Sequence, residues 1–469
     1  MSGSNGCTRL TLDGRHQRAR FRRFPEPHQM TGLHPRYPSR RYAWFMVVVL
    51  MVAYILSFVD RYVLGLLVEP IKADLGLSDT DMGWLLGLSF AIFYATMGIP
   101  LGYLADRKRR TWLIAAGITV WSAATFASGL ARNFWHLFFA RMAIGAGEAT
   151  LSPSAISMIS DSFPQEERGK PIAFYSAALG IGAGVASLVG AGVLSWAKSV
   201  PEISVPIVGV VAPWQFTFFV VGVPGLLIGL LFLFMREPAR HAENKGHEGE
   251  GFTNSLGYIW KRRATYLSYI APMAVSTIIA YSWGWFAAMF ERTWGWAPET
   301  FAVAFGLMTL ILAPVSVLSA GWLNDRWFVA GKEDAAMRIM IIAVSIQVPM
   351  AILTPLMPGP GLALVVLAVA IVSNAMTTAV APTGLVHMTP SGYRGLIIAV
   401  YYMVISLTGL ILGPGTIGWL SDNVFGNEHL DYATAAVPAI FGIPVLLLLP
   451  YALRRYRQEL ARRAALQLA

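Results

Sequence analysis

An arginine and a glutamate interrupt a long apolar run in the stretch Arg141-Met-Ala-Ile-Gly145-Ala-Gly147-Glu148-Ala149. The run extends from about Phe134 to Ile159 and is long enough to cross a lipid bilayer as a helix. Seven residues are close to two helical turns, so Arg141 and Glu148 share one helix face, about 10 Å apart. Lipid cannot solvate charges at this depth, which predicts that both side chains face a bundle interior or a wet cavity.

A third intramembrane charge, Asp60, lies in the first apolar run at a depth between those of Arg141 and Glu148. These three residues, with the adjacent Arg61, form the predicted polar site within the membrane. A carboxyl group whose surroundings change between a cation and an apolar wall can load and release a proton. The alternative is purely structural: Asp60 pairs with Arg61 or Arg141, and Arg141 and Glu148 hold helices together.

The composition is that of a membrane protein. Of the 469 residues, 55% are hydrophobic and only 13% are charged, whereas a soluble domain has about 25% charged residues. The net charge of +10 comes from basic residues in short loops between apolar runs, a pattern that orients a membrane protein, so no nucleic-acid partner is expected. The single cysteine, Cys7, excludes a disulfide framework and a cysteine-based metal site.

Twelve apolar runs have spanning length. They cover about 43–67, 82–104, 111–130, 134–160, 171–197, 214–235, 266–290, 300–323, 338–356, 362–387, 395–421 and 433–453. Lys and Arg concentrate on the side of both termini, which predicts that both termini are cytoplasmic.

One long polar segment, 236–265, divides these spans into two sets of six. It predicts a cytoplasmic linker between an N-terminal six-helix bundle, 43–235, and a C-terminal six-helix bundle, 266–455. The basic tail 1–42 lacks the apolar core and cleavage site of a secretory signal peptide, and we expect it at the cytoplasmic leaflet. A cytoplasmic tail, 456–469, follows the second bundle.

The two halves repeat each other. Gly102-Tyr-Leu-Ala-Asp106-Arg107 at the end of span 2 recurs as Gly321-Trp-Leu-Asn-Asp325-Arg326 at the end of span 8. A second repeat relates spans 5 and 11, and Arg168 and Arg394 occupy equivalent places at their starts. Two parallel repeats with a binding site at their interface are typical of secondary transporters.

Residues of these repeats are the predicted gating residues: Asp106, Arg107, Arg168, Asp325, Arg326 and Arg394. A carboxylate is stabilised beside a helix N-terminus. We therefore expect Asp106 to meet the start of span 11 near Arg394, and Asp325 to meet the start of span 5 near Arg168, when the cytoplasmic side is closed.

The segment Gly102-Tyr-Leu-Ala-Asp106-Arg107-Lys-Arg109-Arg110 resembles the loop 2–3 signature of the major facilitator superfamily, with Lys108 where that signature usually has glycine. The segment Asp60-Arg61-Tyr62, the stretch 141–149 and the segment 154–168 look like the Spinster branch of that superfamily. The superfamily resemblance implies an all-α membrane protein with twelve transmembrane helices in two pseudo-symmetric six-helix bundles.

The superfamily resemblance covers residues 42–457 and implies a secondary active transporter that works by alternating access. The Spinster branch implies an amphipathic, anionic lysolipid or sphingoid-phosphate-like substrate, protons as the coupling ion and a bacterial-type inner membrane. Span 5 has the glycines of the antiporter signature without its proline, which leaves antiport open. We expect a monomer among membrane lipids, without cofactor, metal or enzymatic activity, because the sequence has no phosphate-binding loop, zinc spacing or nucleophile elbow.

The spans of the second half carry no Asp, Glu, Lys or Arg away from their ends. Spans 7 and 10 instead offer aromatic and polar residues that we expect to line the cavity: Tyr281, Trp283, Trp285, Phe286, Asn374 and Thr377. A cavity with one charged wall and one apolar wall suits an amphipathic substrate. For any one of these aromatic residues, ordinary helix packing is the alternative.

Arg141 is the predicted anchor of the anionic headgroup, because its planar guanidinium can hold a phosphate through two hydrogen bonds. Two other functions stay open at this point. A carrier of small organic anions, sugars or drugs would need more hydrogen-bonding residues in spans 7 and 10. A non-transporting membrane sensor would keep the fold without moving a substrate.

Overall fold

The computed structural model describes residues 37–200, 203–206, 208–240 and 252–468. Within these residues every element is helical except one short β-hairpin, which confirms the predicted all-α membrane fold. Ten helical stretches in the described residues are long and apolar enough to cross a membrane. Residues 1–36 of the predicted N-terminal tail and 241–251 of the predicted linker lie outside the described residues.

In the first half, the long helices are α1 (Arg40–Leu66), α5 (Arg110–Ser128), α8 (Gly169–Ser199) and α9 (Pro213–Phe234). The predicted spans 2 and 4 each consist of two consecutive helices: α3 (Asp79–Leu86) with α4 (Leu88–Arg107), and α6 (Phe134–Glu148) with α7 (Leu151–Ser162). A short helix, α2 (Val68–Leu75), follows α1, and β1 (Ile203–Val205) pairs antiparallel with β2 (Gly209–Val211).

In the second half, α10 (Phe252–Lys261) precedes the long helix α11 (Arg263–Ser282), which continues through one 3₁₀ turn, η3 (Trp283–Trp285), into α12 (Phe286–Trp294). The remaining long helices are α13 (Pro298–Val329), α14 (Ala335–Leu353), α15 (Pro360–Met388), α16 (Arg394–Leu420) and α17 (Leu430–Leu468).

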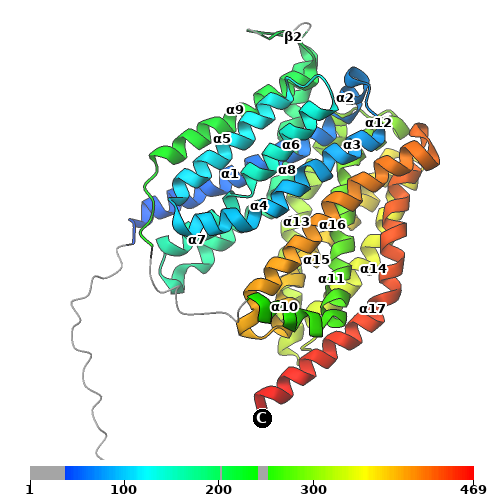
Figure 1. Ribbon diagram of the computed structural model, residues 1–469. Coiled ribbons are helices and arrows are strands. Elements are labelled where there is room, and N and C mark those ends of the chain that lie inside the picture. Colours follow the sequence, from blue (N-terminus) through cyan, green and yellow to red (C-terminus); the bar gives the residue numbers. More distant parts are fainter. Residues whose placement is uncertain (1–36, 201–202, 207, 241–251, 469) are drawn as a thin grey trace, which may run out of the picture. The chain divides into compact units, whose positions relative to one another are not determined.

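The helices run between two ends, which Figure 1 separates clearly: α2, α3 and α12 lie at one end, and α7 and α10 lie at the other. We call the first the Asp79 end, because α3 begins there at Asp79. We call the second the linker end, because α9 finishes there and α10 begins there.

The two glycines between Arg141 and Glu148 allow α6 to pack closely. A Cβ atom on Gly145 would lie 2.4 Å from the carbonyl oxygen of Phe90 on α4, and one on Gly147 would lie 2.6 Å from the carbonyl oxygen of Gly117 on α5. Small residues permit such close approach in membrane helix bundles. The end of α6, with its glutamate, is thereby held inside the first half.

Glycines also line the contacts between the two halves. A Cβ atom on Gly87, at the break between α3 and α4, would lie 1.9 Å from the carbonyl oxygen of Leu410 on α16. Gly184 of α8 and Gly306 of α13 also lie close together. A Cβ atom on either would lie within 3 Å of the carbonyl oxygen of the other. The first half therefore meets the second along α3–α16 and α8–α13.

Candidate transport site

Arg61 of α1 and Glu148 at the end of α6 form an ion pair in the interior of the first half. The Arg61 Nη2 atom lies 2.5 Å from Glu148 Oε2, and Arg61 Nε donates a hydrogen bond of 2.7 Å to the same oxygen. The Glu148 side chain is 1% exposed and the Arg61 side chain is 13% exposed. A carboxylate at a helix C-terminus meets the negative end of the macrodipole, so Glu148 depends on this cation.

Aromatic rings hold the Arg61 guanidinium in place. Its Cζ atom lies 4.6 Å from the ring centroid of Phe90 and 4.7 Å from that of Tyr94, both on α4, and 5.6 Å from that of Phe58. Cation–π contacts of this kind gain strength away from water. We did not predict Phe90 and Tyr94 from the sequence, although their spacing of four residues places both on one face of α4.

The Arg141 guanidinium binds main-chain oxygens in this structure, and its predicted role as headgroup anchor stays a prediction. The residue is 2% exposed, and its Nη1 donates to the backbone oxygen of Asp60 at 3.0 Å while its Nε donates to the backbone oxygen of Leu85 at 3.4 Å. It thus ties α1 and α3 to α6. Among the described arginines of this cluster, Arg61 is the more exposed.

Asp60 is buried, at 3% exposed, but its carboxyl group makes neither predicted pairing. Arg141 binds the main chain of Asp60, and within the described residues the Oδ1 atom has no hydrogen-bond partner. The Thr125 hydroxyl of α5 lies beside the carboxyl group. The site therefore combines a paired glutamate with a second carboxyl group that has no cation bonded to it.

Four of the six residues predicted to line the cavity are buried between packed helices. Each of the four is at most 8% exposed: Trp283, Trp285, Phe286 and Thr377. The Trp285 indole donates to the backbone oxygen of Pro414 at 3.0 Å, which anchors η3 to α16. The sequence could not distinguish the two roles, because an apolar aromatic ring fits a helix interface and a cavity wall equally well.

Tyr281 and Asn374 are the predicted lining residues that keep partial exposure. Tyr281 lies beside Arg61 and packs against the apolar cluster of the first half, so it brings the second half to the ion pair. Asn374 Oδ1 accepts a hydrogen bond from Gln347 Nε2 at 3.3 Å and lies 2.9 Å from Ser276 Oγ. These two contacts, with Ser276 and Gln347, fix the orientation of the Asn374 amide.

A polar network joins the two halves at the Asp79 end, and nothing in the sequence had singled it out. Arg292 of α12 donates to both carboxylate oxygens of Asp79, at 2.7 and 2.8 Å, and to Glu69 at 2.8 Å. Lys72 also pairs with Asp79, and Ser421 donates to it at 2.6 Å. We call these five residues the Asp79 lock.

The Asp79 carboxylate stays charged over a wide pH range. Burial alone would raise its pKa, but hydrogen bonds from Arg292, Lys72 and Ser421 outweigh burial and lower the pKa to about 2. Asp422 adds a further contact between the halves, since its carboxylate accepts the backbone N–H groups of Asp79 and Thr80, at 3.2 and 2.7 Å, at the N-terminus of α3.

At the linker end, Arg168 and Arg394 bind main-chain oxygens of their own halves. Arg168 Nε donates to the backbone oxygen of Phe163 at 2.9 Å, and Arg394 Nε donates to that of Thr389 at 3.0 Å, in equivalent ways. Asp325 is exposed. Within the described residues, the ion pairs between the halves all lie at the Asp79 end.

Arg107 lies over the Tyr103 ring and Arg326 over the Trp322 ring, at 4.0 and 5.2 Å from the centroids. The side chain of Asp106 lies outside the described residues. The predicted gate contacts belong to a state that is closed at the linker end, so they stay a prediction.

A polytopic helical protein whose two halves meet around a partly exposed intramembrane ion pair is, as a class, a membrane transporter. The family profile of the Major Facilitator Superfamily matches residues 50–414. This chain belongs to the Major Facilitator Superfamily.

Two relatives and one solved structure are similar to this chain. The chain is 27% identical to an MFS-type efflux pump of Mycolicibacterium smegmatis over 92% of this chain and 96% of that protein. It is 28% identical to Protein spinster of Drosophila melanogaster over 49% of this chain, an alignment that spans only 36% of that protein's own length. Its fold matches a bacterial homolog of the human lysosomal transporter Spinster, inward-facing and unoccupied, with a TM-score of 0.74 and 23% identity over 90% of this chain and 98% of that one. These two Spinster matches agree with the resemblance to the Spinster branch.

Proposed function

We propose that this protein is a proton-coupled secondary transporter of an amphipathic, anionic lysolipid or sphingoid-phosphate-like lipid. The observation that carries the proposal is the Arg61–Glu148 ion pair, whose arginine keeps 13% of its side chain exposed inside a membrane helix bundle. An ionisable group within a membrane helix bundle is by default a candidate for a substrate or ion pathway. The guanidinium suits a phosphate, because two of its N–H groups can bind two phosphate oxygens together.

The pair also supplies a route for coupling. A substrate phosphate that binds Arg61 competes with Glu148 for the same N–H groups. The membrane interior cannot solvate the freed glutamate, so binding a proton there removes an expensive charge. Asp60, whose Oδ1 atom has no partner among the described residues, is the second candidate for a proton site.

The surroundings of Arg61 favour a substrate with an apolar portion. Phe58, Phe90 and Tyr94 surround the guanidinium from the first half, and Tyr281 approaches it from the second. Such walls can bury an acyl or sphingoid chain next to a bound headgroup.

The arrangement in the membrane belongs to the same proposal. We place the linker end in the cytoplasm, together with both termini, because the loops there carry most of the Lys and Arg residues. The bundles would then be 43–235 and 266–455, with 236–265 as the cytoplasmic linker, in a monomer of a bacterial-type inner membrane. With this orientation the Asp79 lock closes the side that faces away from the cytoplasm.

A carrier of small organic anions, sugars or drugs is the second candidate, because the relative that aligns over nearly the whole chain is an efflux pump. A small carboxylate could also bind Arg61. The aromatic surroundings distinguish the two candidates, since a small hydrophilic anion gains nothing from them. A membrane sensor that binds without transporting is the third candidate.

Transport assays on the purified chain in proteoliposomes decide among these functions. We expect saturable movement of lysophosphatidic acid or sphingosine phosphate, and much slower movement of an uncharged lipid with the same chain. Transport of a small organic anion without transport of either lipid would establish the second candidate instead. Binding of lipid, measured on the same preparation, without any transport would establish the sensor.

Proton coupling is tested with substitutions that keep shape and remove only a titrating group. Glu148→Gln and Asp60→Asn are expected to abolish the acceleration of lipid transport by an imposed pH gradient, while the purified variants still fold. Uptake with and without the gradient is the measurement. A variant that keeps the full response to pH excludes its residue as the proton site, and two such variants would contradict proton coupling through this cluster.

A further inference from the structure

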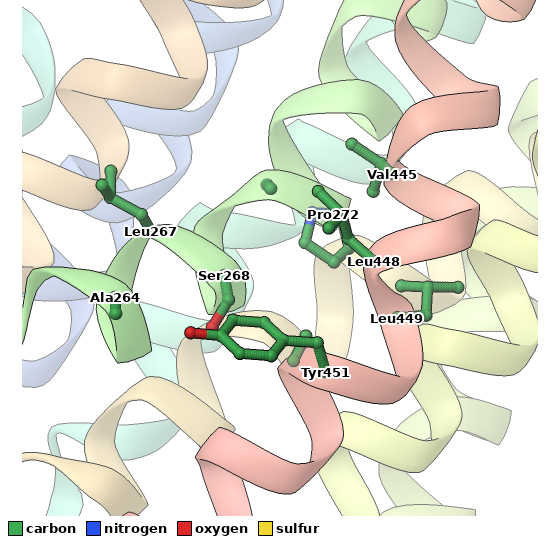
Figure 2. A pocket seen from close by; sticks show the side chains of 10 residues that line it. Ala264, Leu267, Ser268, Pro272, Val445, Leu448, Leu449 and Tyr451 are labelled. Carbon is green, nitrogen blue, oxygen red and sulfur yellow. The ribbon is translucent and has the colours of Figure 1, made fainter.

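A groove with apolar walls lies between α11 and α17 (Figure 2). Its volume is about 280 Å³, and its lining includes Leu267 and Pro272 of α11 and Val445, Leu448 and Tyr451 of α17. Among the described residues, its lining belongs to the second half alone. Leu267 is 63% exposed and Leu448 is 52% exposed, so the groove opens on the membrane-facing surface of the second half.

Prolines explain why two long helices leave this space. Pro272 lies within α11, and Pro444 and Pro450 lie within α17. Each proline lacks an N–H group and its ring crowds the preceding turn, which bends a helix. These prolines lie beside the groove, since Pro272 itself lines it and Pro444 and Pro450 are next to lining residues of α17.

Two arginines border the groove on its linker side. The helices are antiparallel, so Arg263 precedes the groove on α11 and Arg455 follows it on α17. Arg455 Nε donates to the Tyr451 hydroxyl at 2.9 Å, which directs this guanidinium toward the lining tyrosine. Arg263 is exposed and lies 5.1 Å from the ring centroid of Trp260, itself 70% exposed.

These two arginines differ from Arg262 and Arg457 in one respect. Arg262 pairs with Glu459, and Arg457 pairs with Asp334. Arg263 and Arg455, by contrast, pair with no acidic side chain in the described part of the chain. Their positive charge beside an apolar groove is therefore open to an external anion.

We propose that this groove binds an anionic phospholipid of the surrounding bilayer, with an acyl chain between α11 and α17 and the phosphate at Arg263 and Arg455. The groove runs from Ala264 to Pro272, about 12 Å along the helix axis, which places its far end within the acyl region when the arginines lie at the headgroups. Trp260 and Tyr451 are the residue types that mark the membrane interface. Basic pockets between transmembrane helices bind anionic headgroups.

Native mass spectrometry of the full chain in detergent tests the proposal. The probes are phosphatidylglycerol and phosphatidylcholine with the same acyl chains. We expect the wild type to retain phosphatidylglycerol more tightly, and Arg263→Gln and Arg455→Gln each to weaken that retention roughly fivefold. Phosphatidylcholine retention should change little. Ser268→Leu, which narrows the groove, should weaken retention of both lipids.

Arg326→Gln is the matched control. Arg326 also follows an aromatic residue by four positions and lies over the ring of Trp322 at the linker end, but neither residue lines the groove. This control should leave retention of phosphatidylglycerol unchanged. Equal retention of the two lipids by the wild type, or an equal loss in the control and in the two groove variants, would overturn the proposal.

Discussion

Arg61→Gln is expected to abolish lipid transport and to lower the free energy of unfolding by about 3–5 kcal/mol, the usual effect of removing one partner of a buried ion pair. The reason is that Glu148, with a side chain that is 1% exposed, would lose its cation at the negative end of α6. Unfolding of the purified variant by SDS titration measures the stability, and proteoliposome uptake measures the activity.

The double variant Arg61→Gln/Glu148→Gln separates the two effects. With both charges removed, no uncompensated carboxylate remains, so most of the stability should return. Transport of the anionic lipid should stay absent, because the phosphate has lost its partner. Transport by Arg61→Gln at the wild-type rate would show that this arginine does not bind the headgroup.

Arg141→Gln provides the contrast, since Arg141 binds backbone oxygens rather than a carboxylate. It should also lower stability, because two buried carbonyl groups would lose a donor. Adding Glu148→Gln should not restore that stability. Rescue of Arg141→Gln by Glu148→Gln, as for Arg61→Gln, would mean that the glutamate pairs with Arg141 in solution.

Asp79→Ala is expected to shift the transporter toward a state that is open at the Asp79 end. It leaves Arg292 and Lys72 without the carboxylate that joins them, which removes about 3–5 kcal/mol from the closed arrangement. Spin labels at Leu130 and Leu356, both exposed near that end in opposite halves, should move apart in double electron–electron resonance measurements. An unchanged distance would contradict the lock.

Lys198→Gln is the matched control, because Lys198 and Glu299 form another ion pair between the halves at the same end. Their side chains are 41% and 23% exposed, and exposed pairs contribute at most about 1 kcal/mol. The label distance should therefore change little. A shift as large as that of Asp79→Ala would mean that any charge at this end controls closure.

The lock should not respond to physiological pH. In the closed state the pKa of Asp79 is about 2, below the ordinary value of 3.8. The contribution of Asp79 to the stability of the closed state is therefore complete above about pH 4 and is lost only as the pH falls toward 2. The label distance should be constant between pH 5 and pH 8. Any pH dependence of transport in that range would then arise elsewhere, and Asp60 and Glu148 are the candidates.

Most of the fold could be predicted from the sequence, because hydropathy and loop charge act on local segments. The spans and the doubled motif around Asp106 and Asp325 follow from patterns within short stretches. The breaks at Gly87 and after Glu148 could not be predicted, since both lie inside continuous apolar runs. They depend on helices that press against those points from elsewhere in the chain.

The sequence by itself determined that a small set of charges lies within the membrane. Asp60, Arg141 and Glu148 each lie inside an apolar run of spanning length, wherever the ends of that run are placed. Only the tertiary structure decided their partners. Arg61 meets Glu148 across 87 positions of the chain, and Arg292 meets Asp79 across 213. Residue spacing tells which face of one helix a charged residue occupies. The partner of that residue depends on how closely other helices approach. Glycines set this approach through contacts with residues that are distant in sequence.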